Sequence, residues 1–145
     1  SVRLALEAGV DVLAHTPTEL LPGDLVSALA GAGVSVVSTV RAFGAGRDAR
    51  RNLAALADAG CVVAYGTDLG NGRIRPGIDP EELAILEQAL GGRERALAAA
   101  TSGSGRLAGH GGKVRPDAPA DLVWVPRFDS YEDLRRDARV FIGSP

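Results

Sequence analysis

The fold is decided by the stretch Cys61-Val62-Val63-Ala64-Tyr65-Gly66-Thr67-Asp68-Leu69-Gly70, in which an apolar run leads into a carboxylate and a glycine-rich loop. The β-branched residues at its start predict a buried strand, and Gly66 allows close backbone approach where that strand leaves its sheet. An acidic residue just beyond such a strand lies at the rim, where α/β folds keep their sites. Asp68 is therefore the first candidate for chemistry, although an aspartate near glycine after a strand is also common in helix caps and turns.

Upstream of this stretch the chain repeats one pattern, an amphipathic helix stopped by glycine and followed by a strand. The predicted strands span residues 10–14, 34–40 and 61–65, and His15 directly follows the first of them. Asp48 is expected to cap the helix before the third strand, and Gly60 to stop it. This alternation predicts parallel βαβ units, which in this order form a doubly wound sheet or part of a (β/α)8 TIM-type barrel.

Downstream, the loop over residues 70–77 is rich in Gly and Arg. Asp79 and Pro80 are a strong helix start, and a second helix is expected over residues 94–107. From Gly109 the composition changes to Gly, Pro and Asp, with short strands expected over residues 122–125 and 140–142. We therefore divide the chain into a partial barrel over residues 1–108 and a small β-rich segment over 109–145.

Composition excludes several classes of function. The chain has 145 residues, of which 46% are hydrophobic, and 16 basic against 18 acidic side chains give a net charge of −2. These totals predict a soluble globular protein without a nucleic-acid groove, and the apolar runs are too short for a membrane span. The single cysteine, Cys61, is expected to be a small core residue. Ser1 already lies in a helical pattern, so the chain is expected to begin elsewhere, and its localisation stays open, with the cytoplasm favoured.

His15 and Asp68 are the pair that matters most. Each follows the end of a strand, and parallel strands bring such side chains to the same rim. A histidine with a carboxylate can bind a divalent metal or move a proton from water. His15 alone is equally well explained as a hydrogen-bonded structural histidine, and catalytic zinc usually needs three protein ligands.

Four segments resemble the C-terminal half of metal-dependent amidohydrolases, notably the imidazolonepropionase-like branch. They are Ala8-Gly9-Val10-Asp11-Val12-Leu13-Ala14-His15, Asn52-Leu53-Ala54-Ala55-Leu56-Ala57-Asp58-Ala59-Gly60, Ala64-Tyr65-Gly66-Thr67-Asp68 and Ala98-Ala99-Ala100-Thr101-Ser102. Residues 112–123 are similar to the segment with which these enzymes return to their composite β-sandwich domain. The resemblance implies strands six to eight of the barrel and the helices that follow them.

The resemblance also implies a site. His15 takes the place of the histidine after the sixth strand, and Asp68 that of the aspartate after the eighth, so both are expected to be catalytic and to bind one or two divalent metals, with zinc as the expected ion. The family's His-x-His after the first strand, and its ligands after the fourth and fifth, have no counterpart here. His110 is no substitute, because it lies in the linker to the β-rich segment.

Three functions follow as hypotheses. The leading one is a fragment of a metal-dependent hydrolase that cleaves a C–N bond of a small-molecule substrate with a metal-activated water. The alternative is a non-catalytic half-barrel that pairs with itself or with another subunit, since the resemblance implies that the N-terminal half of the barrel is missing. A third is a doubly wound domain that binds a small anion. Arg41 and Arg73 in rim loops are candidates for contact with a substrate carboxylate, although loop arginines are more often solvated.

Overall fold

Three short parallel strands carry the candidate site. The computed structural model describes residues 1–70, 74–109 and 111–143. Strands β1 (Val12–Leu13), β2 (Ser35–Ser38) and β3 (Val63–Tyr65) form one sheet in the order β1-β2-β3. The register pairs Val12 with Ser35 and Val36 with Val63. The α/β arrangement with a parallel sheet is therefore confirmed, and the assignment to barrel strands six to eight stays a prediction.

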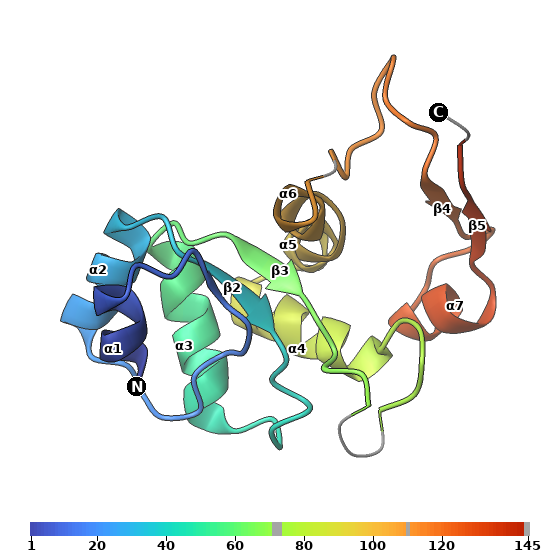
Figure 1. Cartoon of the computed structure of the whole chain (residues 1–145). Coiled ribbons are helices and arrows are strands. Elements are labelled where there is room, and N and C mark those ends of the chain that lie inside the picture. Colours follow the sequence, from blue (N-terminus) through green and yellow to red (C-terminus); the bar gives the residue numbers. More distant parts are fainter. Residues whose placement is uncertain (71–73, 110, 144–145) are drawn as a thin grey trace.

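A helix precedes each of these strands. Helices α1 (Val2–Glu7), α2 (Gly23–Gly31) and α3 (Arg47–Asp58) lie together at one end of the molecule (Figure 1). The apolar stripes of α2 and α3 supply fully buried leucines to the core cluster that also contains Val36 of β2, as amphipathic helices beside a sheet do. Within the described residues no helix is long and apolar enough to cross a bilayer.

Helix α4 (Pro80–Leu90) begins where the sequence predicts. The Asp79 side chain accepts hydrogen bonds from the backbone N–H groups of Glu81 and Glu82, and Gly91 ends the helix at a φ of 75°. A left-handed residue at a helix end favours glycine, because other side chains are strained there. The predicted helix start at Asp79 is therefore confirmed.

The helix expected over residues 94–107 is one helical segment with a π turn inside it. It comprises α5 (Arg93–Ala98), the π-helical η1 (Ala99–Gly103) and α6 (Ser104–Leu107). A Cβ on Gly103 would collide with the carbonyl oxygen of Val63. The Ser104 hydroxyl accepts from the Tyr65 N–H at 3.2 Å and donates to Ala99 O at 2.9 Å. The π turn thus lets this helix contact the edge of β3 that does not pair with β2.

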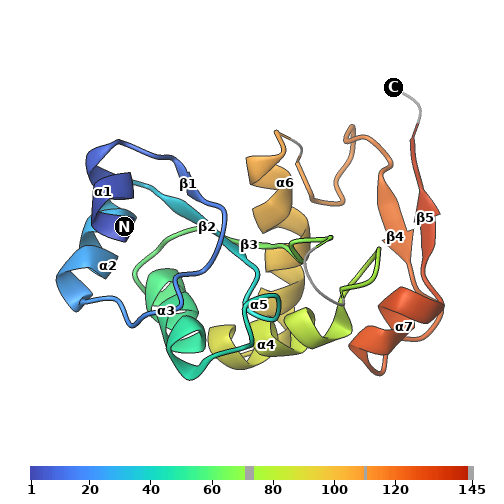
Figure 2. The same cartoon turned by 60° about the horizontal axis from the view of Figure 1, so that its bottom comes forward.

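The β-rich segment forms the other end of the molecule. Strands β4 (Leu122–Trp124) and β5 (Arg139–Phe141) pair antiparallel, and α7 (Tyr131–Arg136) lies between them in sequence. Helices α4 to α6 separate this hairpin from β1 to β3 (Figure 2). The Arg93 guanidinium lies over the rings of Phe128 and Tyr131, at 5.3 and 5.7 Å from their centroids. These contacts attach the segment to the helical layer.

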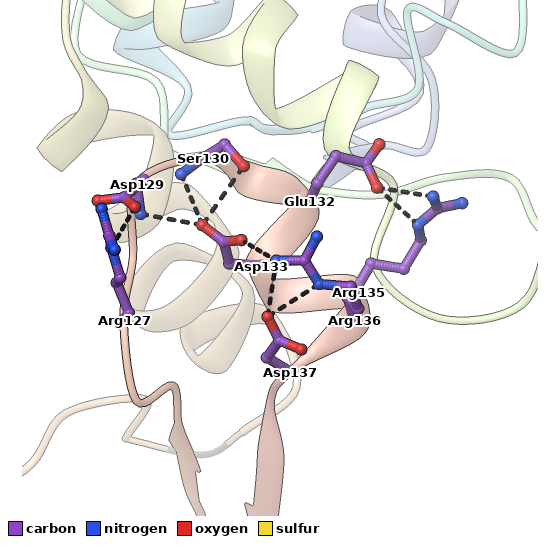
Figure 3. A network of polar contacts seen from close by, with 8 residues as sticks. All are labelled: Arg127, Asp129, Ser130, Glu132, Asp133, Arg135, Arg136 and Asp137. Atoms are coloured by element: carbon purple, nitrogen blue, oxygen red, sulfur yellow. Dashed lines mark hydrogen bonds and ion pairs between the residues drawn. The ribbon is translucent and has the colours of Figure 1, made fainter.

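Charged side chains organise α7 from within (Figure 3). The Asp133 carboxylate accepts from the backbone N–H groups of Asp129 and Ser130 at 2.9 and 2.8 Å, and Arg136 donates to it at 2.8 Å. Hydrogen bonds to the ionised form lower the pKa of Asp133, with Ser130 and then Asp129 as the largest causes. Helix α7 is therefore stabilised by hydrogen bonds and an ion pair of Asp133 as well as by the burial of Tyr131.

Some element boundaries differ from the sequence prediction. The three strands are shorter than residues 10–14, 34–40 and 61–65, because Val34 and Val40 are buried without joining the paired register. Asp48 does not cap α3: the cap residue is Gly46, and Asp48 lies in the first turn, where an acid meets the positive end of the helix dipole. Cys61 is a buried thiol whose pKa is raised by burial, as expected for a core residue.

Candidate active-site rim

His15 lies at the rim, two residues beyond the end of β1. Its Nδ1 is 3.1 Å from the Thr39 hydroxyl, and its ring meets the Phe43 ring edge to face at a centroid distance of 4.9 Å. The histidine itself is exposed. One nitrogen of the ring is thus engaged, and Nε2 is the nitrogen left for a ligand.

Thr39 links the exits of all three strands. It directly follows β2, and only 2% of its surface is exposed. Its hydroxyl contacts His15, and its Cγ2 would lie 3.4 Å from a Cβ placed on Gly66, the residue that follows β3. Thr39 therefore stands between the histidine of the first strand and the loop that carries Asp68.

Asp68 lies three residues beyond β3, on the same edge of the sheet, and is half-buried. Its φ of 51° is in the left-handed region, which is uncommon for a residue other than glycine. It does not cap α4, because that position belongs to Asp79. Aspartate tolerates this conformation better than most residues, so the φ angle describes the loop and is not by itself a sign of a functional site.

A buried carboxylate fixes the loop after β2. Glu82 on α4 is 1% exposed and accepts from the Ser38 hydroxyl, from the Val40 N–H at 3.2 Å and from the Arg41 N–H at 2.7 Å. Burial raises the pKa of Glu82, while these three donors oppose that rise. The carboxylate thus satisfies the backbone groups that a strand exit leaves unpaired.

Arg41 is occupied by carboxylates of the chain itself. Its guanidinium donates to Asp79 and, at 2.6 Å, to Glu81. The interpretation of Arg41 as a substrate contact is therefore not supported, and an arginine held by its neighbours is the better description. Arg73, the other arginine considered, lies outside the described residues.

Tyr65 joins this cluster at the end of β3. Its hydroxyl accepts from the Asp79 N–H at 2.7 Å. Burial raises the pKa of Tyr65 to about 12, with smaller contributions of the same sign from the Asp79 and Glu82 charges. The phenol therefore stays neutral at ordinary pH and acts as a structural hydrogen-bond partner.

A cavity of about 710 Å³ opens beside His15. Its walls come from the first turn of the chain, the residues after β1, and Phe43. The loop over residues 16–22 is held there by Asn52 on α3, whose side chain donates to Pro17 O at 2.8 Å and to Glu19 O at 2.7 Å and accepts from the Leu21 N–H at 2.9 Å. The cavity is large enough for a small molecule.

The rim places His15 and Asp68 at the same edge of the sheet, after strands that are not neighbours. Strands β1 and β3 are separated by β2, so their axes lie about 10 Å apart. Within residues 1–70, 74–109 and 111–143, no three His, Cys, Asp or Glu side chains form a group that could hold a metal. His15 and Asp68 stay candidate ligands, two donors at one rim.

Sequence reasoning missed Thr39, Glu82 and Asn52. A signal existed for Glu82, because it lies one residue before Leu83 and four before Leu86 and therefore shares the apolar face of its helix. Ser38 and Thr39 are likewise buried polar residues in the mainly apolar segment over residues 34–40. Polar residues at positions where periodicity demands apolar ones mark buried hydrogen-bond networks.

Comparison with solved structures finds proteins of similar fold. They include a protein described as uncharacterised (TM-score 0.80, 20% identity), a prolidase complexed with N-methylphosphonate-L-proline (TM-score 0.77, 20% identity) and an amidohydrolase (TM-score 0.74, 21% identity). Each match covers 99% of this chain, which spans only 43%, 43% and 42% of the matched chains.

Comparisons based on the sequence give no match. No protein-family model and no curated protein matches it at a significant level. The solved structures support the broader resemblance to amidohydrolases and not the narrower one to the imidazolonepropionase-like branch. At this identity the likeness concerns the fold: the chain has the α/β fold found in part of a prolidase and of an amidohydrolase.

Proposed function

We propose that the chain supplies one rim of the active site of a metal-dependent hydrolase that cleaves C–N bonds. The observation that carries this proposal is the placement of His15 and Asp68 at the carboxyl ends of parallel strands in one sheet. That edge is where (β/α)8 enzymes assemble their catalytic groups from several strands. The fold shared with a prolidase and an amidohydrolase supports the same reaction class.

The donor set fits a divalent metal in part. His15 offers an exposed imidazole nitrogen, and Asp68 offers a carboxylate three residues beyond β3, which are the ligand types that zinc accepts. A bound zinc or similar ion supplies a water of lowered pKa for attack on the scissile carbon. In this proposal the remaining ligands come from outside the described residues or from another chain.

The roles of the two residues differ. His15, held by Thr39 and Phe43, binds or orients through Nε2 at the mouth of the cavity. Asp68 accepts the proton of the attacking water and delivers it to the leaving nitrogen, as a carboxylate within hydrogen-bond reach can do. The substrate class to test first is a dipeptide that ends in proline, because one fold relative is a prolidase.

Zinc titration by calorimetry tests the assignment of ligands. We expect His15→Asn and Asp68→Asn each to weaken zinc binding at least about ten-fold, since each removes a ligand atom. Asp117→Asn is the matched control for Asp68, because Asp117 is also an aspartate at positive φ (63°) and is exposed. His110→Asn is the matched control for His15→Asn.

Hydrolysis of a dipeptide ending in proline is measured on the same preparations. The proposal predicts zinc-dependent release of proline that both site variants abolish and both controls retain. Zinc binding that survives His15→Asn and Asp68→Asn unchanged would contradict the ligand assignment. Hydrolysis that persists without metal would contradict the reaction class.

Exposed apolar surface favours assembly as a second candidate function. The β4–β5 hairpin leaves Val123, Trp124, Val140 and Phe141 at least half exposed, from 50% to 68%. An apolar hairpin of this kind is typical of an interaction surface. Sedimentation velocity decides between the candidates: a stable assembly that neither binds zinc nor hydrolyses the dipeptide would favour the non-catalytic half-barrel.

A further inference from the structure

The residues before and after Thr39 both form hydrogen bonds to the carboxylate of Glu82. The Ser38 hydroxyl and the Val40 N–H both donate to Glu82 Oε1, and the Arg41 N–H donates to Oε2 at 2.7 Å. Thr39 lies between these anchors, 2% exposed, with few rotamers open to a β-branched side chain. Its hydroxyl therefore has one well-defined direction, which is toward His15 Nδ1 at 3.1 Å.

We propose that Thr39 and Glu82 are positioning residues for His15. Glu82 holds the Ser38 side chain before Thr39 and the backbone N–H groups of Val40 and Arg41 after it. The Thr39 hydroxyl then accepts the Nδ1–H of His15, so that the lone pair of Nε2 faces the cavity. This inference rests on the proposed function for its purpose, because a ring fixed through one nitrogen presents the other as a ligand. Its structural content does not depend on a metal.

The geometry excludes a simpler explanation by ring stacking alone. Phe43 meets the His15 ring edge to face at 62°, which limits the tilt of the ring but does not distinguish between its two nitrogens. A hydrogen bond to one nitrogen does distinguish them, and among the described residues the hydrogen bond found at this ring is the one to Thr39. A hydroxyl can accept from Nδ1–H or donate to unprotonated Nδ1, so the acceptor role of Thr39 is part of the proposal and is what the tautomer measurement tests.

Glu82 acts at a distance from the ring. Its carboxylate lies on α4 and meets the loop after β2 only through Ser38, Val40 and Arg41. A Gln at this position keeps one acceptor oxygen but turns an N–H₂ group toward a backbone N–H, which opposes at least one of the three bonds. We therefore expect Glu82→Gln to loosen Thr39 and, through it, the orientation of His15.

Nitrogen-15 NMR of the imidazole rings in the full chain tests this, without added metal and at a pH where the histidines are neutral. The chain has only two histidines, so His110→Asn leaves the His15 signals alone in the spectrum. The wild type and Thr39→Ser are expected to show Nδ1 protonated. Thr39→Val, which keeps the shape and removes the hydroxyl, is expected to shift the tautomer ratio toward Nε2–H by about two- to ten-fold.

Glu82→Gln is compared with Glu87→Gln, a substitution on the same helix at a residue whose ion pair is with Arg93. Glu82→Gln is expected to shift the ratio in the same direction as Thr39→Val, and Glu87→Gln to leave it unchanged. If Glu82→Gln does not fold, Ser38→Ala removes one donor to the carboxylate and is expected to give a smaller shift of the same sign.

Three results would overturn the proposal: an unchanged tautomer in Thr39→Val, no rescue by Thr39→Ser, or equal shifts in the two glutamate variants. Because these spectra contain no metal, they separate the positioning role from the proposed function. A confirmed tautomer with no zinc binding would refute the hydrolase proposal alone, and zinc binding with an unselected tautomer would refute only the positioning role.

Discussion

At the scale of single residues, Gly66 limits what the rim tolerates. A Cβ at this position would collide with Val37 Cγ1 and would lie 3.0 Å from the carbonyl oxygen of Ser38. We expect Gly66→Ala to lower the free energy of unfolding by about 1 to 3 kcal/mol, because a packed strand exit cannot make room without moving β2. Urea unfolding followed by circular dichroism measures this change.

Gly31→Ala is the matched control for that prediction. Gly31 ends α2, and a Cβ there would meet nothing within 4 Å. The same substitution is expected to be neutral or to stabilise by up to about 1 kcal/mol, since alanine is the better helix former. Equal effects of the two substitutions would show that steric contact with Val37 is not what requires glycine at position 66.

Residues differ in how far sequence predicts them. The cap at Asp79 follows from local sequence, because an aspartate followed by Pro80 and two acidic residues is typical of a helix start. Thr39 and Glu82 could not be linked in advance, since 43 positions separate them and the link runs through hydrogen bonds from Ser38, Val40 and Arg41 to the Glu82 carboxylate. His15 and Asp68 were found by position after a strand, and their roles stay predictions.

At the scale of elements, one side chain holds the loop over residues 16–22. Asn52 is 1% exposed and makes all three of its hydrogen bonds to backbone groups of that loop. Asn52→Ala is expected to cost about 2 to 4 kcal/mol of stability, because it leaves buried backbone groups without partners. Since the loop lines the cavity beside His15, proteolysis should cut it faster in this variant.

The neighbouring substitution Arg51→Ala is the control for Asn52. Arg51 is on the same helix, its side chain is 60% exposed, and its nearest carboxylate, that of Asp48, is 3.9 Å away. A loss within about 0.5 kcal/mol is expected for such a surface pair. If both substitutions cost the same, the loop is held by something other than Asn52.

Elements were easier to predict in kind than in length. Apolar periodicity gave the helices that precede each strand, but strand ends depend on which residues find a partner across the sheet. The sheet pairs only two residues of β1, although the predicted strand spans five. Gly103 was the one local sign of the π turn at Ala99–Gly103 in the sequence. The turn could not be predicted from it, because the requirement for glycine comes from the close contact of Gly103 with β3.

At the scale of the whole molecule, the question is whether the segments before and after residue 109 unfold in one cooperative transition. The parallel sheet was predicted from the alternation of helices and strands, and the β-rich segment from the change of composition. How firmly that segment is attached depends on tertiary contacts. Tyr131 of α7 is 7% exposed and belongs to the same core as the leucines of α4. The segment is therefore expected to unfold together with the rest.

The two tyrosines of the chain report on this from opposite ends. Burial raises the pKa of Tyr65 to about 12, and burial followed by the neighbouring Glu87 raises that of Tyr131 to about 12, from an ordinary value near 10. Between these values the unfolded chain has lost protons that the folded chain keeps, so stability is fully present below pH 10 and falls up to about pH 12. The loss is expected to reach up to about 2 kcal/mol per tyrosine.

Ultraviolet absorbance of the phenolates, recorded with far-ultraviolet circular dichroism as the pH rises, measures this directly. With one cooperative unit, both tyrosines ionise in a single transition that coincides with loss of helix, and Tyr65→Phe and Tyr131→Phe each remove half of its amplitude. If Tyr131 ionises first while Tyr65 and most helix remain, the segment beyond residue 109 is a separate unit, and its attachment through Arg93 is weak. A transition near pH 10 for both residues would contradict their burial altogether.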